Sequence, residues 1–482
     1  MAPYSSEFPQ NDPLSYQVKA KKQVHENVQP PFEILNKYRS QMKRLRSGKF
    51  HEIEKSDELS SVFSALSIIR MAKLKSNYSH HKGDFLSTLP NSSHQFDSAL
   101  AHKHTAEHLK RSLCLLDAAD KFFNRKYDQA EKSINAVLSE YSHADDHPVD
   151  RVIACFARDL RERIDIENGK IDLERELVHV DVEQELVDLK SAIHENEQKL
   201  PFSQITHFTA IQTILDSLAS AEKIHFIDIG KKLGSHWIII MHALANRKNI
   251  RIEQLKITVV CTLKDDVEET GDLLSSFAES MNLPFVFKIL HSEMNELKKD
   301  EFELENGETV AVFLEFCLTS LSFCPKNIEA LIQGIKNLNP RVMVVSEVEA
   351  NTSGSAFIDR FDEAIIICSA MFDCLEDCLE RDNKCRVIIE KIYFQEIIKN
   401  GVLSEVEEGF KRCRKIDFWR EYFARFGIVE TELSQASMYQ ASLLIRESCR
   451  WKLCSLSMNG KCMLLGWNGI PLRSLSAWKF SE

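Results

Sequence analysis

The stretch KIHFIDIGKKLGSHWIIIMHALANR, which runs from Lys223 to Arg247, decides the fold of this chain. Its first segment, KIHFIDI (Lys223–Ile229), is apolar and short enough to be a buried strand. A glycine-bearing turn follows, and the apolar residues from about Ser235 onward predict a helix. A strand, a glycine turn and a helix in this order begin a nucleotide- or cofactor-binding unit in α/β proteins. The sequence therefore raises the question whether a cofactor lies on this turn.

Strands and helices alternate from this point onward. The segments that read as strands are LKITVVCT (255–262), PFVFKIL (284–290), TVAVFLEF (309–316) and PRVMVVSEV (340–348). Short apolar strands in this rhythm predict a parallel sheet with helices on both faces. Near the C-terminus, Asn459-Gly460 lies between two apolar segments and is the strongest local signal for a β-hairpin. We therefore predict an α/β fold with a Rossmann-like, methyltransferase-type doubly wound, mostly parallel sheet and a C-terminal antiparallel hairpin.

The residues before this sheet predict an N-terminal α-helical cap. Apolar residues recur at three- and four-residue steps from Leu109 to Phe123, and the pattern resumes from Ala130 after the interruption NRKYD. The segment RVIACFARDLRERI (151–164) predicts a further helix. The apolar stripe either packs into the core or forms a surface for a partner, and its candidate partner residues are Leu109, Leu113, Leu116 and Phe123.

Other segments have weaker signals. We expect residues 1–98 to be mobile apart from a helix over 58–77, and the acidic stretch 166–186 to be a surface loop. Helical patterns cover 356–379 and 386–426. These two ranges predict long helices after the parallel strands.

The composition limits the classes of function. The chain has 482 residues, a net charge of −11 and 13 cysteines. An acidic chain is unsuited to indiscriminate nucleic-acid binding. No apolar run approaches the roughly 18 to 20 residues of a membrane span, and no secretory signal is visible. Without a C-x-x-C pair, the cysteines are interpreted as reduced thiols of an intracellular protein, and no metal ligands are predicted.

The turn after the first strand departs from a cofactor-binding pattern. S-adenosylmethionine enzymes commonly have an acid-x-G-x-G-x-G turn here, and Asp228, Gly230 and Gly234 match it, whereas Lys232 occupies the middle glycine position. Glycine is needed where the backbone approaches a ligand without a Cβ. The second strand ends in Cys261 and Thr262, where a carboxylate for ribose hydroxyls would stand. We therefore predict no cofactor-binding residues.

The sequence also predicts no catalytic residues. His225 alternates with apolar neighbours on the first strand, which is typical of a core histidine and not of a general base. Neither a G-x-S-x-G nucleophile elbow nor a P-loop is present. The expectation is a protein that is not an enzyme, and a methyltransferase with a degenerate cofactor site is the alternative.

The chain resembles the GRAS family of plant transcriptional regulators over about 101–482. IHFID (Ile224, His225, Phe226, Ile227 and Asp228) is similar to the family's VHIID motif, and LGSHW follows with Gly234 and Trp237 at the family spacing. The hairpin after Leu109 is similar to the first leucine-rich region. The C-terminal segment is similar to the family's SAW region through Trp451, Gly460, Trp467, Ser476, Ala477 and Trp478.

The resemblance implies a division of the chain. Residues 1–100 would be a variable N-terminal region and 101–482 the GRAS domain. Within the domain it implies a leucine-rich region I (106–170), a VHIID region (186–252), a leucine-rich region II (266–298), a PFYRE region (308–403) and a SAW region (406–482).

The resemblance also implies a function. A nuclear transcriptional co-regulator is expected, also found in the cytoplasm in some cases, that contacts DNA-binding transcription factors and pairs with a second copy or with other family members. Asp228 is expected to cap or hydrogen-bond the turn and the helix start that follow it. Trp237, Trp467 and Trp478 are expected to be buried anchors. A second alternative is direct DNA binding, for which the basic candidates are Lys231, Lys232, Arg247, Lys248, Arg251 and the segment 411–415.

Overall fold

The structure is a computed structural model, and it describes only part of the chain. The described residues are 64–79, 98–139, 147–170, 182–230, 234–261, 267–354, 356–380, 383–390, 394–398, 411–448 and 450–481. All of them lie in one compact unit, Glu52–Glu482. The basic segment 37–49, Lys231, Lys232, Thr262 and most of the polar residues 1–98 lie outside the described residues.

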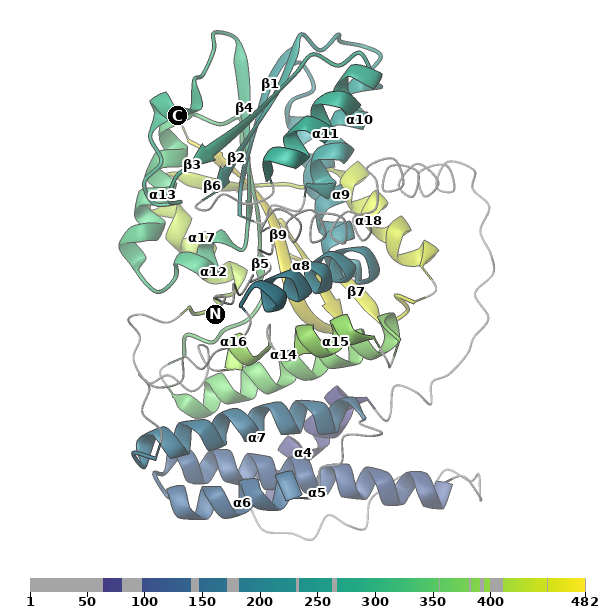
Figure 1. The fold of residues 1–482 in the computed structure, drawn as a ribbon, viewed down its shortest axis with the longest axis vertical. Coiled ribbons are helices and arrows are strands. Elements are labelled where there is room, and N and C mark those ends of the chain that lie inside the picture. Colours follow the sequence, from purple (N-terminus) through teal and green to yellow (C-terminus); the bar gives the residue numbers. More distant parts are fainter. Residues whose placement is uncertain are drawn as a thin grey trace, which may run out of the picture. The chain divides into compact units, whose positions relative to one another are not determined.

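The centre of this unit is one mixed β-sheet (Figure 1). Its order is β3-β2-β1-β4-β5-β9-β8-β7, and β6 pairs with β9 beside this path. Strands β1 to β5 are parallel, and β9 is antiparallel to β5. The strands are β1 (Lys223–Ile229), β2 (Gln254–Cys261), β3 (Phe285–His291), β4 (Glu308–Glu315), β5 (Val342–Val348), β6 (Ile428–Thr431), β7 (Cys454–Asn459), β8 (Cys462–Trp467) and β9 (Ile470–Phe480). The predicted Rossmann-like, methyltransferase-type sheet is confirmed.

Successive side chains of a strand point to opposite faces of the sheet, and the side chains of these buried strands are apolar on both faces. Helices therefore cover both faces of the sheet. Ile227 and Ile229 of β1 pack in one apolar cluster with residues of α12 (Cys317–Leu321), α13 (Pro325–Asn337) and α17 (Ile416–Ala424). The opposite face carries Phe226 and Asp228. It is covered by α9 (Pro201–Ser217), α10 (Ser235–Ala245) and α11 (Val267–Ser280), on the right in Figure 1.

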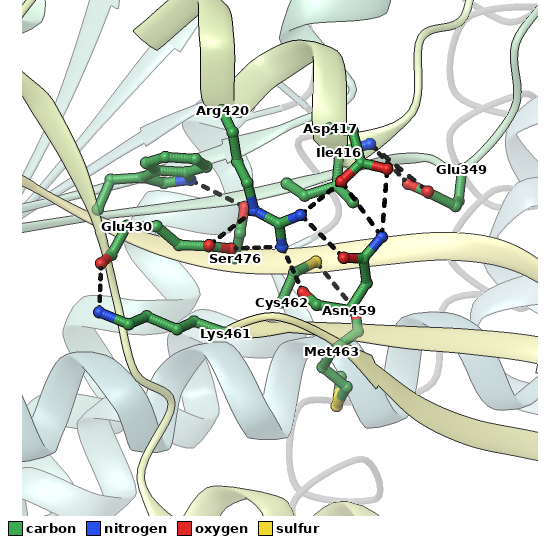
Figure 2. A network of polar contacts seen from close by, with 11 residues as sticks. Glu349, Ile416, Asp417, Arg420, Glu430, Asn459, Lys461, Cys462, Met463 and Ser476 are labelled. Carbon is green, nitrogen blue, oxygen red and sulfur yellow. Dashed lines mark hydrogen bonds and ion pairs between the residues drawn. The ribbon is translucent and has the colours of Figure 1, made fainter. Parts of the chain in front are cut away.

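The C-terminal hairpin forms at Asn459-Gly460 as predicted, with β7 and β8 on either side. Arg420 of α17 fixes its turn (Figure 2). The guanidinium donates to Glu430 of β6 at 2.8 Å, to Asp417 at 2.6 Å and to the side chain and carbonyl of Asn459. A Cβ at Gly460 would lie 2.8 Å from Arg420 Nη2, so glycine allows the turn to pack against the arginine. Arg420 thereby joins α17 and β6 to the hairpin turn about 40 residues further along the chain.

The helical cap consists of α4 (Ala65–Ser79), α5 (Ser98–Phe123), α6 (Tyr127–Ser139) and α7 (Pro148–Glu167), stacked on α14 (Phe357–Cys378) (Figure 1). Arg151 of α7 forms a buried ion pair with Glu376 of α14 at 2.9 Å and another with Glu390 at 3.1 Å. Helix α4 precedes residue 101, where the resemblance places the start of the domain, and packs on α5, α7 and α14. The folded unit therefore includes residues that the sequence assigned to the variable region.

Two expectations about helices were wrong. The range 166–186 is not only a loop, because α8 (Val182–Lys199) begins within it. The range 386–426 is not one helix: its described parts contain α15 (Lys384–Ile388), α16 (Phe394–Ile398) and α17, with α18 (Gln435–Glu447) after them. The reason is tertiary. The amide of Cys413 donates to Thr352 Oγ1 at 2.9 Å and its carbonyl accepts from Thr352 N at 3.1 Å, which holds 411–415 in a non-helical conformation.

Candidate functional site

The carboxyl ends of β1, β4 and β5 form the edge at which α/β proteins of this kind bind ligands. The turn after β1 reaches this edge through two glycines. Gly230 has φ +129°, and a side chain there would collide with the carbonyl oxygen of Glu315. Gly234 has φ +70°, and a Cβ there would lie 2.8 Å from the ring of Trp237. Both positions require glycine for backbone conformation and packing. Lys232, between them, lies outside the described residues.

Asp228 uses its carboxylate inside the protein. Its Oδ2 lies 2.8 Å from His236 Nε2 and accepts a hydrogen bond of 2.7 Å from Trp237 Nε1. All three side chains are buried. The carboxylate of Asp228 is thus hydrogen-bonded to two side chains at the start of α10, the helix that follows the turn. Burial alone would lower the pKa of His236, but the carboxylates of Asp228, Glu315 and Glu197 outweigh this effect and raise its pKa above the ordinary value.

A second set of buried polar side chains, centred on Glu315, lies beside the contacts of Asp228. Glu315, the last residue of β4, has its carboxylate 3.2 Å from His207 Nε2 of α9 and 3.5 Å from Arg473 Nη1 of β9. The rings of His207 and His236 are 4.7 Å apart, so the two groups are in contact. The guanidinium of Arg473 also stacks on Phe316, 4.6 Å from the ring centroid. Side chains of α9, α10 and β9 thus close the edge above β1 and β4.

The end of β5 is closed in a similar way. Glu347 is buried and accepts hydrogen bonds from Leu318 N at 2.6 Å and from the Thr319 hydroxyl at 2.8 Å. Burial raises the pKa of Glu347 to about 7. Cys317 lies at the same edge, and its thiol donates to the carbonyl of Ile229 at 2.8 Å. Burial raises the pKa of Cys317 well above its usual range, which keeps it a thiol and a poor nucleophile.

The described residues of this edge do not match the arrangement that S-adenosylmethionine enzymes use. The cofactor would need an open crevice and a free carboxylate beside the turn. Here His207, His236 and Arg473 cover the strand ends, and the Asp228 carboxylate is bound to α10. In the part of the chain that the structure describes, no group of three or more His, Cys, Asp or Glu side chains is arranged to hold a metal. The cluster is a set of buried ion pairs and hydrogen bonds that join α9, α10 and β9 to the sheet, in which Asp228 Oδ1 and His236 Nδ1 have no hydrogen-bond partner.

His225 lies on the opposite face of β1, near its amino end. Its Nε2 is 2.8 Å from Thr258 Oγ1, and its Nδ1 is 3.3 Å from Glu308 Oε2. Lys256 forms an ion pair of 2.7 Å with the same glutamate. Burial lowers the pKa of His225 to about 4. The interpretation of His225 as a core histidine is confirmed.

The candidate partner residues of α5 are not the residues of this helix that face the core. The residues of α5 that are buried in the core are Leu115, Ala118, Ala119 and Phe122. Leu109, Leu113 and Leu116 are half-buried, and Phe123 is 50% exposed. Leu109 and Leu113 line a shallow, mostly apolar groove of about 420 Å³, with Lys75 of α4, Ala106, Lys110, Cys114 and Asp117. Ala119 of the predicted stripe lies in the core, whereas Leu113, Leu116 and Phe123 each follow a buried residue by one position and turn toward the surface.

The SAW-like residues lie in the C-terminal hairpin and its surroundings. The indole of Trp478 donates to Ser476 Oγ at 2.8 Å and packs edge-on against Phe423 of α17 at 4.7 Å. Trp467 and Ala477 are buried in β8 and β9. The indole of Trp451 donates to the carbonyl of Lys199 at 3.1 Å, which ties the hairpin to α8.

Several cations of the two basic clusters make contacts within the protein. Arg247 donates to the carbonyls of Leu215, Leu218 and Ala221 at the end of α9. Arg412 is buried and donates to the carbonyl of Thr352 at 3.2 Å, and Arg414 stacks on Phe418, 4.3 Å from the ring centroid. Lys415 pairs with Glu363 at 2.6 Å. Segment 411–415 is therefore not a free basic patch, although Lys248 and Arg251 are exposed.

The sequence does not predict which side chains cover this edge of the sheet. His207, Glu315 and Arg473 lie far apart in sequence and follow no short motif. His236 carried a weak signal, because it directly precedes Trp237 within GSHW at the start of α10.

The fold and this edge define a class of protein: a Rossmann-like, methyltransferase-type scaffold whose ligand edge is closed by its own side chains. A model of the GRAS domain family matches residues 112–479, which is more than half of the chain. The chain belongs to the GRAS family.

The relatives are plant proteins. The DELLA protein RGL1 of Arabidopsis thaliana is 32% identical over 287 residues, which cover 59% of this chain and 55% of RGL1. The GRAS family protein RAD1 of Lotus japonicus is 27% identical over 346 residues, which cover 68% of this chain and 66% of RAD1. The chain spans about half the length of the DELLA proteins it matches.

A solved structure agrees with the fold. The crystal structure of SCL7 from Oryza sativa superposes with a TM-score of 0.64 at 26% identity, covering 72% of this chain and 94% of SCL7. Among the described residues, no helix is long and apolar enough to cross a membrane.

Proposed function

We propose that this protein is a nuclear transcriptional co-regulator that acts by binding DNA-binding transcription factors, and that it also associates with a second copy or with other family members. One observation carries this proposal. Paired side chains cover the ends of β1 and β4, where related folds bind their ligands. The cap, by contrast, leaves an apolar groove at Leu109 and Leu113 accessible. A scaffold of this kind can act through its outer surfaces. The DELLA and RAD1 relatives support the regulatory role.

The groove has the properties of a surface for a partner helix. Half-buried leucines form its floor, and Lys75, Lys110 and Asp117 lie around it. Apolar residues in a groove with a charged rim are typical of sites that bind the apolar face of an amphipathic helix. Direct DNA contact has less support, because Arg247, Arg412 and Arg414 hold internal contacts.

The test is capture of transcription factors from plant nuclei by the tagged chain, with mass spectrometry of the bound proteins. Leu113→Asp should reduce recovery of sequence-specific DNA-binding proteins at least about tenfold, because a charge in an apolar interface is left without a partner. Leu273→Asp is the matched control, since Leu273 is an exposed leucine on α11, outside the cap. Its recovery should equal that of the wild type.

A second variant separates binding from folding. Lys110 is exposed at the rim, so Lys110→Glu alters the charge of the groove without entering the core. We expect it to change recovery while the thermal unfolding midpoint stays within a few degrees of the wild type. Unchanged recovery for both Leu113→Asp and Lys110→Glu, with intact folding, would remove the groove from the proposal.

A further inference from the structure

Three successive residues between β5 and α14 each accept a hydrogen bond from a different arginine. The pairs are Arg412 with the carbonyl of Thr352 at 3.2 Å, Arg414 with the hydroxyl of Ser353 at 3.1 Å, and Arg360 with the carbonyl of Gly354 at 2.9 Å. Arg360 and Arg412 are each only 5% exposed, so the structure holds their guanidinium groups in place. Ser353 is the residue of the three whose own side chain meets a guanidinium.

Two of these arginines belong to the basic segment 411–415, for which the proposed function gives no role. Both backbone groups of Cys413 bind Thr352: its amide donates to Thr352 Oγ1 at 2.9 Å, and its carbonyl accepts from Thr352 N at 3.1 Å. Helix α17 begins directly after this segment, and the amide of Ile416 donates to Glu349 at 3.1 Å. The contacts of Ser353 therefore lie where the chain after β5 is joined to the start of α17.

The hydroxyl of Ser353 lies at the surface. Ser353 and Gly354 are half-buried, and Asn351 is exposed. Asn351 Oδ1 accepts from the Ser353 hydroxyl at 2.7 Å and from its amide at 3.3 Å, which is the geometry of an Asx-turn. A serine in a surface turn between two elements is accessible to a modifying enzyme, whereas one inside a strand of the sheet is not.

The charges around this turn suit an anion. Of the two carboxylates on the first turns of α14, Glu363 pairs with Lys415 at 2.6 Å, and Asp359 is exposed to solvent, which screens its charge. A phosphate monoester on a serine carries a charge of about −1.5 to −2 and three acceptor oxygens. Guanidinium groups bind such oxygens through charge-assisted hydrogen bonds that are roughly twice as strong as neutral ones. The neutral hydroxyl of Ser353 accepts only one N–H of Arg414.

We propose that Ser353 is a phosphorylation site and that its phosphate is held by Arg414 between Arg360 and Arg412, which fastens segment 411–415 to the turn after β5. In this step the Ser353 oxygen bonds to the γ-phosphorus of ATP on a protein kinase. The bond from that phosphorus to the β-phosphate oxygen breaks, ADP leaves, and the hydroxyl proton passes to a base of the kinase. This modification is separate from the apolar groove of the cap, and it does not depend on the proposed function.

Mass spectrometry of the full chain tests whether the site is used. The tagged chain is recovered from plant cells with phosphatases inhibited and is cleaved with trypsin, which releases the peptide 342–360. Fragmentation of this peptide should place a phosphate on Ser353, and Ser353→Ala should remove that phosphate. Ser346 lies in the same peptide and is 0% exposed, so it is the internal control and should carry none.

Hydrogen exchange tests what the phosphate does. A full chain with phosphoserine incorporated at position 353 during synthesis should exchange the amides of Thr352 and Cys413 at least about threefold more slowly than the unmodified chain, because stronger bonds hold the two segments together. Arg414→Gln should abolish most of this slowing, and Arg414→Lys, which keeps the charge but loses the planar fork, should retain part of it. Phosphoserine at position 457, an exposed residue of β7, is the matched control and should leave both amides unchanged.

Three results would overturn the proposal. The first is a chain from plant cells that carries no phosphate on Ser353. The second is a chain with phosphoserine at position 353 whose Thr352 and Cys413 amides exchange as fast as those of the unmodified chain, or faster. The third is a slowing of the same size in Arg414→Gln, which circular dichroism and thermal unfolding show to be folded.

Discussion

At the scale of single residues, buried carboxylates cap helices to which they do not belong. Glu347 of β5 accepts the amide of Leu318 in α12, Glu349 accepts the amide of Ile416 at the start of α17, and Asp373 accepts two amides of α4. Burial raises the pKa of Glu347 and of Glu349 to about 7, and that of Asp373 to about 6. Each of these residues therefore links helix packing to protonation.

The sign of this linkage is testable at Glu347. A carboxyl whose pKa is higher in the folded state than in the unfolded state binds more protons when folded, so stability falls as pH rises between the two pKa values. For Glu347 the window runs from 4.5 to about 7. We expect the free energy of unfolding to fall across this window, with a contribution from Glu347 on the order of 3 kcal/mol.

Urea denaturation at pH 5 and pH 8 measures the effect. Glu347→Gln keeps an acceptor for the Leu318 amide but cannot ionise, so its stability should change less between the two pH values. Equal changes in the variant and the wild type would show that Glu347 does not titrate in this window.

At the scale of elements, one arginine joins α17, β6 and the β7–β8 turn (Figure 2). We expect Arg420→Gln to reduce the free energy of unfolding by about 2 to 3 kcal/mol, because Glu430 and Asp417 lose a partner that bonds to both. The loss of stability should be greatest in the β7–β8 hairpin. Hydrogen exchange of the β7 and β8 amides should therefore become faster than that of β1.

Lys461→Gln provides the control for this element. Lys461 is exposed and makes a contact of 3.1 Å with the carbonyl of Glu430. Its removal should change stability by less than about 0.5 kcal/mol. If Arg420→Gln were as mild as Lys461→Gln, the hairpin would be held by its apolar contacts and not by the arginine.

At the scale of the whole molecule, the closed edge predicts how the scaffold responds to the ligand of its fold class. Isothermal titration of S-adenosylmethionine into the folded chain should give no binding heat up to millimolar ligand, since His207, His236 and Arg473 cover the strand ends. An active methyltransferase of similar fold, titrated in the same buffer, is the positive control. Micromolar binding would mean that the edge opens in solution.

Much of the fold is predictable from local patterns. The strand Lys223–Ile229, its glycine turn and the hairpin at Asn459-Gly460 are visible because apolar runs, glycines and turn residues act over a few positions. The site is less predictable. The sequence predicts that Asp228 bonds to the turn and helix start after it, but only the structure shows that the side chains of His236 and Trp237 are its partners. In α5, Ala119 of the predicted stripe faces the core, whereas Leu113, Leu116 and Phe123 lie one residue away from buried side chains.

The sequence by itself determined the order of the elements, the parallel sheet and the positions of its turns. Only the tertiary structure decided that the ligand edge is closed. His207, Glu315 and Arg473 are separated by more than one hundred residues, and they meet because the crossovers align the ends of β1 and β4 while β9 returns antiparallel beside β5. Hydrophobic periodicity and turn residues report only on structure within a few positions of the sequence. The contacts among these three side chains join residues that are far apart in sequence, so no local pattern predicts them.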